Sequence, residues 1–211
     1  MPNLFPRKVK KKVIGYGEGA IVKETGVKGI VARFYRKRLL DWRREEGAAD
    51  SPKFAFYKNK IARLIAPENF LHVTAAFQRA KPSMWVTLSK KKVFDVTSQG
   101  IVDAVNNNRL MHPRNTKRRL AFEKSVAFKE HTARVEKEAR PLAFALWDKG
   151  IEVNINPYNV FFDKKGNPVF LDVVSIEPYL VGQAFPGNKK IEKYLERATG
   201  EWGRIVPKEE W

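Results

Sequence analysis

The stretch GIEVNINPYNVFFDKKGNPVFLDV, residues 150–173, decides the fold predicted for this chain. It contains two short apolar runs, 160–162 and 169–171, on either side of a turn rich in Asp, Gly and Asn. Apolar, β-branched and aromatic residues flanking such a turn are typical of a β-hairpin. Asn159 precedes the first strand and Asp172 follows the second, so the hairpin would bring an amide and a carboxylate side by side.

This pair of side chains predicts a site for a hard cation. Mg²⁺ binds in proteins through a few oxygen ligands and takes the rest from phosphates and water. Asn159 and Asp172 are therefore the candidate metal ligands. The alternative is a surface hairpin with polar ends and no ligand.

The segment 152–159, EVNINPYN, resembles the catalytic loop of protein kinases, H-R-D-L-x-P-x-N, and Asp172 falls where the D-F-G motif would begin. In that family the Asn and the D-F-G Asp hold Mg²⁺ on the phosphates of ATP, and the loop Asp accepts the proton of the substrate hydroxyl. The resemblance implies ATP and Mg²⁺ as cofactors, with Asn159 and Asp172 at the metal. It places Asn154 at the base position, where an amide cannot accept a proton at neutral pH.

The N-terminal part carries a second set of motifs. Residues 13–23, VIGYGEGAIVK, predict a strand, a glycine turn and a strand, and glycine permits the close backbone approach that a phosphate-covering loop needs. The alternative is an ordinary tight turn. Residues 30–33 resemble the V-A-I-K strand of kinases, with Arg33 at the lysine position, where the charge is kept but the shape becomes a planar fork. The resemblance makes the following residues candidates for nucleotide binding: Gly15, Gly17, Gly19 and Arg33.

Helical patterns complete the predicted architecture. Residues 52–65 have the apolar spacing of a helix at the place of the kinase C-helix, but they lack its ion-pairing glutamate; Glu45 and Glu46 lie upstream. Residues 120–149 predict one long helix, kinked at Pro141. Residues 191–198 predict a short helix near the C-terminus.

The order of these elements predicts an α+β, bilobal, protein-kinase-like fold. The expected N-lobe, residues 1–88, has an antiparallel sheet, with strands expected at 70–77 and 83–88, and one helix. The expected hinge is 89–92, and residues 89–211 form a reduced, mostly helical C-lobe. This small size resembles minimal kinases, such as the RIO-type atypical kinases and the small kinase of the tRNA-threonylcarbamoyl complex.

Composition sets further bounds. The 211 residues are 43% hydrophobic and 12% aromatic, which predicts a folded core. No apolar run is long enough to cross a bilayer, and a cytoplasmic location is the simplest expectation. The absence of cysteine excludes disulfides and thiolate metal sites and leaves the redox compartment undetermined. The formal charge of +18 attracts polyanions such as nucleic acid, although a generally basic surface is the alternative. The cluster that we single out consists of Arg114, Lys117, Arg118 and Arg119.

Two functions remain open from the sequence. In one, the protein is an ATP-dependent kinase acting on a protein or a small molecule. In the other, it is a pseudokinase scaffold that binds ATP and Mg²⁺, is weakly active or inactive, and holds a protein partner. Departures at four positions favour the pseudokinase: Arg33, the missing glutamate, Asn154 and the Val173-Val174 pair in place of Phe-Gly. A nucleic-acid-binding module on a kinase-like frame is compatible with either.

Overall fold

A computed structural model describes most of the chain, namely residues 13–16, 20–35, 52–79, 84–111 and 113–202. Gly17 and Gly19, two of the predicted phosphate-loop glycines, lie outside the described residues. So do Glu45 and Glu46, the upstream acidic residues.

The first layer is a five-stranded antiparallel sheet in the order β1-β2-β3-β5-β4. Its strands are β1 (Val13–Tyr16), β2 (Ala20–Glu24), β3 (Ile30–Tyr35), β4 (Val73–Arg79) and β5 (Met84–Lys90). Ala32 pairs with Leu88 and Phe34 with Val86, and because side chains alternate along a strand these four buried residues share one face. The predicted α+β class is confirmed.

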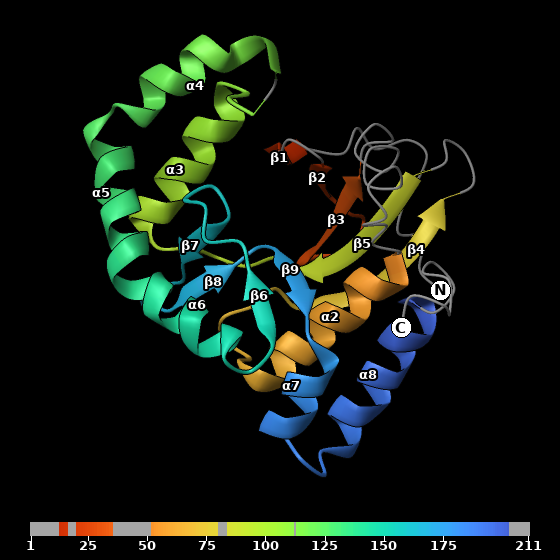
Figure 1. The fold of residues 1–211 in the computed structure, drawn as a ribbon. Helices are drawn as coiled ribbons and strands as arrows, with labels where there is room; N and C mark the ends of the chain where they lie inside the picture. The colour runs from red at the N-terminus through yellow and green to blue at the C-terminus, as the bar shows by residue number, and fades with distance from the viewer. Residues whose placement is uncertain (1–12, 17–19, 36–51, 80–83, 112, 203–211) are drawn as a thin grey trace.

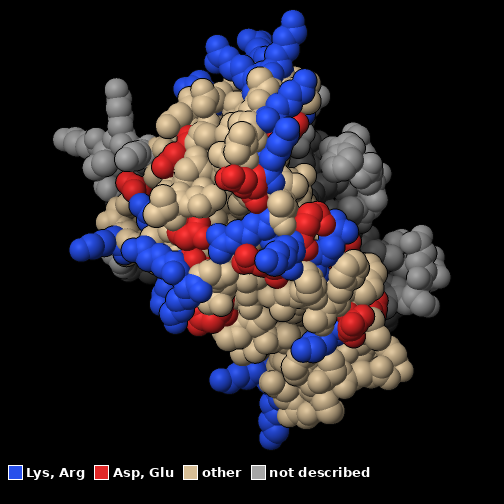
Figure 2. Space-filling model, turned by 90° about the vertical axis from the view of Figure 1, so that its left-hand side faces the viewer, with Lys and Arg blue, Asp and Glu red and all other residues tan. Residues whose placement is uncertain are grey.

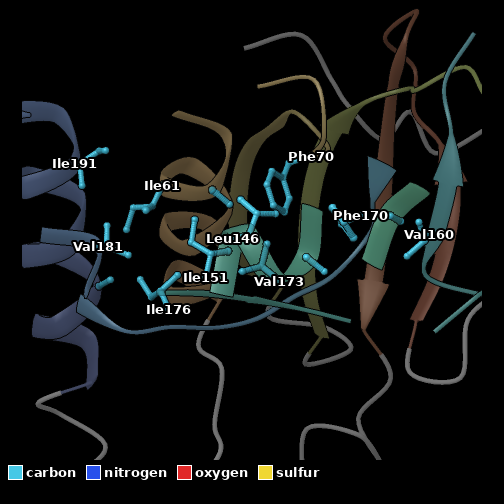
Figure 3. Close-up of a cluster of buried hydrophobic side chains, with 14 of the residues drawn as sticks. Ile61, Phe70, Leu146, Ile151, Val160, Phe170, Val173, Ile176, Val181 and Ile191 are labelled. Carbon is cyan, nitrogen blue, oxygen red and sulfur yellow. The ribbon is translucent and has the colours of Figure 1, made fainter. Parts of the chain in front are cut away.

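The helix α2 (Pro52–Ile65) links this sheet to the rest of the molecule. Its fully buried Ile61 and Ala62 belong to the largest apolar core, which continues into the C-terminal half of the chain. The C-terminal helix α8 (Lys189–Trp202) lies along α2, and the rings of Tyr57 and Tyr194 are 6.0 Å apart (Figure 1). Figure 3 shows this core running from Ile191 on α8 past α2 to the hairpin.

A run of helices forms the outer edge of the molecule (Figure 1). In chain order it consists of α3 (Val96–Asn107), the 3₁₀ turn η1 (Pro113–Asn115), α4 (Thr116–Glu123), α5 (Val126–Arg134), the π-helical turn η2 (Val135–Ala139) and α6 (Arg140–Trp147). For residues 93–119 the sequence predicts an irregular segment or a short helix, and the structure has the regular helix α3 in this range.

The single long helix predicted over 120–149 is wrong. The chain breaks at Ser125, whose hydroxyl accepts a hydrogen bond from the Phe128 N–H and so starts α5 as a new helix. The expected distortion at Pro141 takes the form of η2, in which the Arg140 N–H reaches back to the Val135 carbonyl. A wider turn here accommodates a proline that has no N–H to donate and crowds the preceding turn.

The predicted hairpin is confirmed. Strands β7 (Val160–Phe162) and β8 (Pro168–Phe170) pair antiparallel, and all residues of β7 are buried. Asp163 holds the turn, because its Oδ1 accepts hydrogen bonds from the N–H groups of Lys165 and Asn167. Gly166 has a φ of 84°, a left-handed conformation that favours glycine.

Two further elements surround the hairpin. Strand β6 (Ile151–Val153) pairs with β9 (Val173–Ile176), so the residues just after Asp172 belong to a sheet. The short helix α7 (Pro178–Ala184), absent from the sequence-based expectation, follows β9, and α8 extends well beyond the predicted 191–198. Among the helices in the described ranges, none combines the length and the low polarity that crossing a bilayer requires.

Candidate functional site

The base of the hairpin brings together the two predicted metal ligands. The Leu171 N–H donates to the Asn159 carbonyl at 2.8 Å, so the backbone at the start of β7 is paired with the residue before Asp172. Asn159 and Asp172 are both half-buried. Within the described part of the chain, neither side chain makes a hydrogen bond or an ion pair, and their oxygens are available to a ligand.

Arg33 approaches the same point from the sheet. This half-buried residue lies in β3, between β2 and β5, and its Nη1 donates a hydrogen bond to the Leu171 carbonyl oxygen at 3.4 Å. The predicted phosphate-binding cation therefore contacts the backbone of the residue that precedes Asp172. Gly15 lies in β1, which pairs with β2 through an irregular register.

Asn154, at the predicted base position, also contacts the base of the hairpin. Its N–H donates to the Asp172 carbonyl oxygen at 3.2 Å. Its side-chain Oδ1 accepts from the Asn156 N–H at 3.0 Å, and the Asn156 side chain in turn accepts from the Tyr158 N–H at 2.9 Å. Two successive Asx turns thus shape the loop that leads to Asn159. The Asn154 oxygen serves the loop, and its remaining polar group, the NH₂, is a donor.

His131 of α5 fixes the far side of this loop. It is fully buried, and its Nε2 lies 3.0 Å from the Pro157 carbonyl oxygen and 3.1 Å from that of Val160. With two acceptors opposite it, Nε2 carries the proton, and Nδ1 has no partner within the described residues. Burial lowers the pKa of His131, and the nearby Arg134 lowers it further, against the opposing effect of the two carbonyls. The Phe161 ring stacks against His131, with the ring centroids 5.6 Å apart, and sequence reasoning missed the link from this histidine to the loop.

A buried lysine occupies the helix that should carry the kinase glutamate. Helix α2, PKFAFYKNKIARLI, contains no acidic residue at all. Its Lys58 is only 2% exposed and donates from Nζ to the Val174 carbonyl oxygen at 2.9 Å. Sequence reasoning missed Lys58; the available signal was a lysine directly beside the apolar stripe. This bond and that of Arg33 hold the segment 171–174 from two sides.

The structure of residues 89–91 differs from that expected for a hinge. Ser89 and Lys90 still belong to β5, where Ser89 pairs with Val31. The N–H of Lys90 donates to the His72 carbonyl at 2.9 Å and that of Lys91 to the Gly29 carbonyl at 2.8 Å. These two donors are therefore not available to an adenine ring.

An ion pair between half-buried Lys92 and buried Asp163 ties the connection after β5 to the hairpin. Lys92 Nζ lies 3.2 Å from Asp163 Oδ2. Burial alone would raise the pKa of Asp163, but hydrogen bonds from Asn167, Lys92 and Lys165 outweigh it and hold that pKa below its usual value. The hairpin is therefore anchored by a charged side chain that stays ionised at neutral pH.

Tyr158 connects the loop to the outer helices. Its hydroxyl donates to Glu123 Oε1 on α4 at 3.1 Å, and its ring lies 4.9 Å from that of Phe128. Burial, followed by the Glu123 carboxylate, raises the pKa of Tyr158 well above its usual value, so the phenol remains a donor. The residue next to Asn159 is thus linked to α4.

The ligand set at the hairpin base fits Mg²⁺ only together with phosphates. It comprises one carboxylate and one amide, and no cluster of three or more His, Cys, Asp or Glu occurs in the described ranges. Two side-chain oxygens near the guanidinium of Arg33 are suited to a metal ion whose remaining ligands are nucleotide phosphates and water. They are poorly suited to a metal that the protein must coordinate alone.

Comparison with known proteins gives no family assignment. No family model matches the chain, and no curated protein is detectably similar in sequence. Among solved structures, the chain is similar to WbdD, with 14% identity and a TM-score of 0.41 over 87% of this chain and 35% of that one. It is also similar to the apo form of PpkA-294, with 12% identity and a TM-score of 0.43 over 92% of this chain and 67% of that one.

A third similar structure is WbdD crystallised with the kinase inhibitor LY294002, at 14% identity and a TM-score of 0.39 over 92% of this chain and 46% of that one. This chain spans about a third to a half of the two WbdD structures. TM-scores of this size do not define a common fold, and no functional conclusion follows from them.

Proposed function

We propose that this protein is a kinase-like scaffold that binds the phosphates of a nucleotide together with Mg²⁺ and transfers phosphate slowly or not at all. Asp172 and Asn159 would hold the metal, and Arg33 would contact the phosphates. The observation that carries this proposal is the contact between Arg33 Nη1 and the Leu171 carbonyl, because it joins two distant predicted motifs at one point. The unengaged oxygens of Asn159 and Asp172 beside that contact support it.

Three observations argue against efficient transfer. Asn154 uses its side-chain oxygen within the loop and offers an acceptor hydroxyl no base. Helix α2 brings Lys58, not a glutamate, toward the segment after Asp172. Strand β9 continues directly from that segment and pairs with β6, so these residues are part of a sheet. An active kinase remains the alternative, since phosphoryl transfer depends mainly on positioning and charge.

The pairing of residues 90 and 91 bears on which nucleotide base the protein prefers. Because the N–H groups of Lys90 and Lys91 already have partners, the base gains fewer hydrogen bonds from this segment. We infer that phosphates and metal supply most of the affinity, so that ATP and GTP bind about equally well.

Thermal-shift and calorimetric titrations test the proposal. We expect Mg·ATP and Mg·GTP to stabilise the protein similarly, and EDTA to remove most of the effect. Asp172→Ala should abolish the Mg²⁺-dependent part, and Asn159→Ala should weaken it. Asp148→Ala is the matched control, because Asp148 is an exposed carboxylate at the end of α6 and should leave binding unchanged.

A protein with a charge of +18 binds ATP nonspecifically at low salt, so the titrations need physiological ionic strength. No stabilisation by Mg·ATP under these conditions would contradict the proposal. Stabilisation that persists in EDTA and in Asp172→Ala would place the nucleotide elsewhere.

Polyanion binding is a second candidate function. The observation that favours it is the exposure of Arg114, Lys117 and Arg118 beside the end of the molecule that carries α4. A titration with heparin over a range of salt tests it, because binding through phosphate-like charges weakens steeply as salt rises. If the affinity for heparin does not depend on salt concentration, or if no binding occurs at low salt, these residues are only a solvated surface.

A further inference from the structure

Helix α4 projects from one end of the molecule. It lies at the turn of the chain between α3 and α5, away from the five-stranded sheet (Figure 1). None of its residues is buried, and Lys117, Arg118, Leu120 and Ala121 are all exposed. A helix with so little burial contributes little to the core, so its exposed side chains can serve a surface function.

The charge of this end is strongly one-sided. Between residues 114 and 129 the chain carries six cations and one acidic residue, Glu123. That carboxylate is engaged by the Tyr158 hydroxyl at 3.1 Å and lies 3.7 Å from Arg119. Figure 2 shows the side of the molecule that lies at the left in Figure 1, and basic side chains gather at its upper end, at the height of α4. The six cations are Arg114, Lys117, Arg118, Arg119, Lys124 and Lys129.

The cations lie on more than one side of the helix. Successive residues of an α-helix are rotated by about 100°, so Lys117 and Arg118 point in different directions, while Lys124 returns to the side of Lys117. A helix that lies on a membrane segregates its cations from a broad apolar face. Here the large apolar side chains that are exposed among the described residues 114–129 are Leu120, at 49%, and Val126, at 71%. Cations on several sides instead suit a partner whose phosphates lie on both flanks of the helix.

We propose that α4 is a docking helix for double-stranded DNA, which enters the major groove and contacts the phosphates of both strands through Lys117, Arg118 and Lys124. The major groove of B-form DNA is wide enough for an α-helix and is bordered by phosphates on each side. The major groove of duplex RNA is deep and narrow and does not admit side chains. This inference rests on the second candidate function and is independent of the nucleotide site.

Fluorescence anisotropy with labelled nucleic acids tests the inference on the full chain. The probes are a duplex DNA of about 20 base pairs, the same sequence as single-stranded DNA and as duplex RNA, and anionic phospholipid vesicles. The test variant is Lys117→Glu/Arg118→Glu/Lys124→Glu. The matched control is Lys189→Glu/Lys190→Glu/Lys193→Glu, which changes the charge equally at exposed positions on α8.

We expect the wild type and the α8 control to prefer duplex DNA, and the α4 variant to lose most of that affinity. Each phosphate neutralised contributes about 0.9 to the slope of log K against log salt concentration, so the α4 variant should lower the slope by about 3. Circular dichroism and the Tm should be unchanged, since the substituted residues are exposed.

Several results would overturn the inference. Equal losses in the two variants would mean that only total charge matters. A preference for duplex RNA, single strands or vesicles would assign α4 another partner. If the wild type binds heparin but not DNA through α4, this inference alone fails; if no polyanion binds at low salt, the second candidate function fails with it.

Discussion

Arg33 Nη1 donates a hydrogen bond to the carbonyl oxygen of Leu171 at 3.4 Å, across 138 residues of chain. This contact places a guanidinium of β3 beside the residue that precedes Asp172. It joins the N-terminal sheet to the hairpin at the point where the two predicted metal ligands lie.

The charge of Arg33 should matter more to nucleotide binding than its shape. We expect Arg33→Ala to weaken Mg·ATP about 10-fold to 100-fold, the value of a hydrogen bond to a charged group. Arg33→Lys, which keeps the charge, should retain most of the affinity. Calorimetry measures both, with Lys28→Ala as the control that removes one exposed positive charge elsewhere. Equal binding by wild type and Arg33→Ala would remove Arg33 from the site.

Restoring the kinase carboxylate should give little activity. In Asn154→Asp, a carboxylate oxygen can still accept the Asn156 N–H, so the loop should keep its shape. General-base assistance is worth about 10²–10⁴-fold where the rest of a site is intact. Because α2 supplies no carboxylate, we expect a much smaller gain in ATP-dependent phosphorylation of a generic acceptor. A gain of about 100-fold or more would mean that the protein is a slow kinase lacking only its base.

Stability should fall as the pH drops below about 6.5, in part because of His131. Its pKa is lowered in the folded state, whereas in the unfolded chain it takes up a proton near the ordinary value of 6.5. The unfolded state therefore binds more protons below that pH, and the free energy of unfolding decreases. Urea denaturation at pH 7.5 and pH 5.5 measures this.

His131→Gln keeps a donor but does not titrate, so it should be less stable at pH 7.5 and lose less stability on acidification than the wild type. His72, whose pKa is lowered by burial and by Arg63, contributes with the same sign, but it is present in both proteins and cancels in the comparison. Identical pH dependence in the two proteins would mean that His131 does not stay neutral in the fold.

Gly150 should tolerate no side chain. Its φ is 79°, and a Cβ there would lie 2.7 Å from the Glu177 carbonyl oxygen, a backbone atom that cannot easily move. We expect Gly150→Ala to destabilise the protein by about 3 kcal/mol or more. The control, Gly100→Ala in α3, meets no atom within 4 Å and should stabilise by about 0.5–1 kcal/mol. A neutral Gly150→Ala would show that the turn after α6 can rearrange.

The sequence by itself determined the local elements. The two short apolar runs and the turn chemistry of Asp163 and Gly166 were enough to predict the hairpin, because these preferences act over a few residues. For the same reason the α+β class and the strand that carries Arg33 could be predicted. The helix breaks were harder, since Ser125 as a cap competes with an apolar pattern that continues on both sides of it.

Only the tertiary structure decided which groups meet. Lys58 could be recognised as buried, and as a donor to Val174, only once α2 was packed between β9 and α8. Likewise, the bonds from His131 to the loop before β7 link segments that are far apart in the chain. Such contacts depend on how whole elements pack, because hydrogen bonds between distant residues require positions that no local preference specifies.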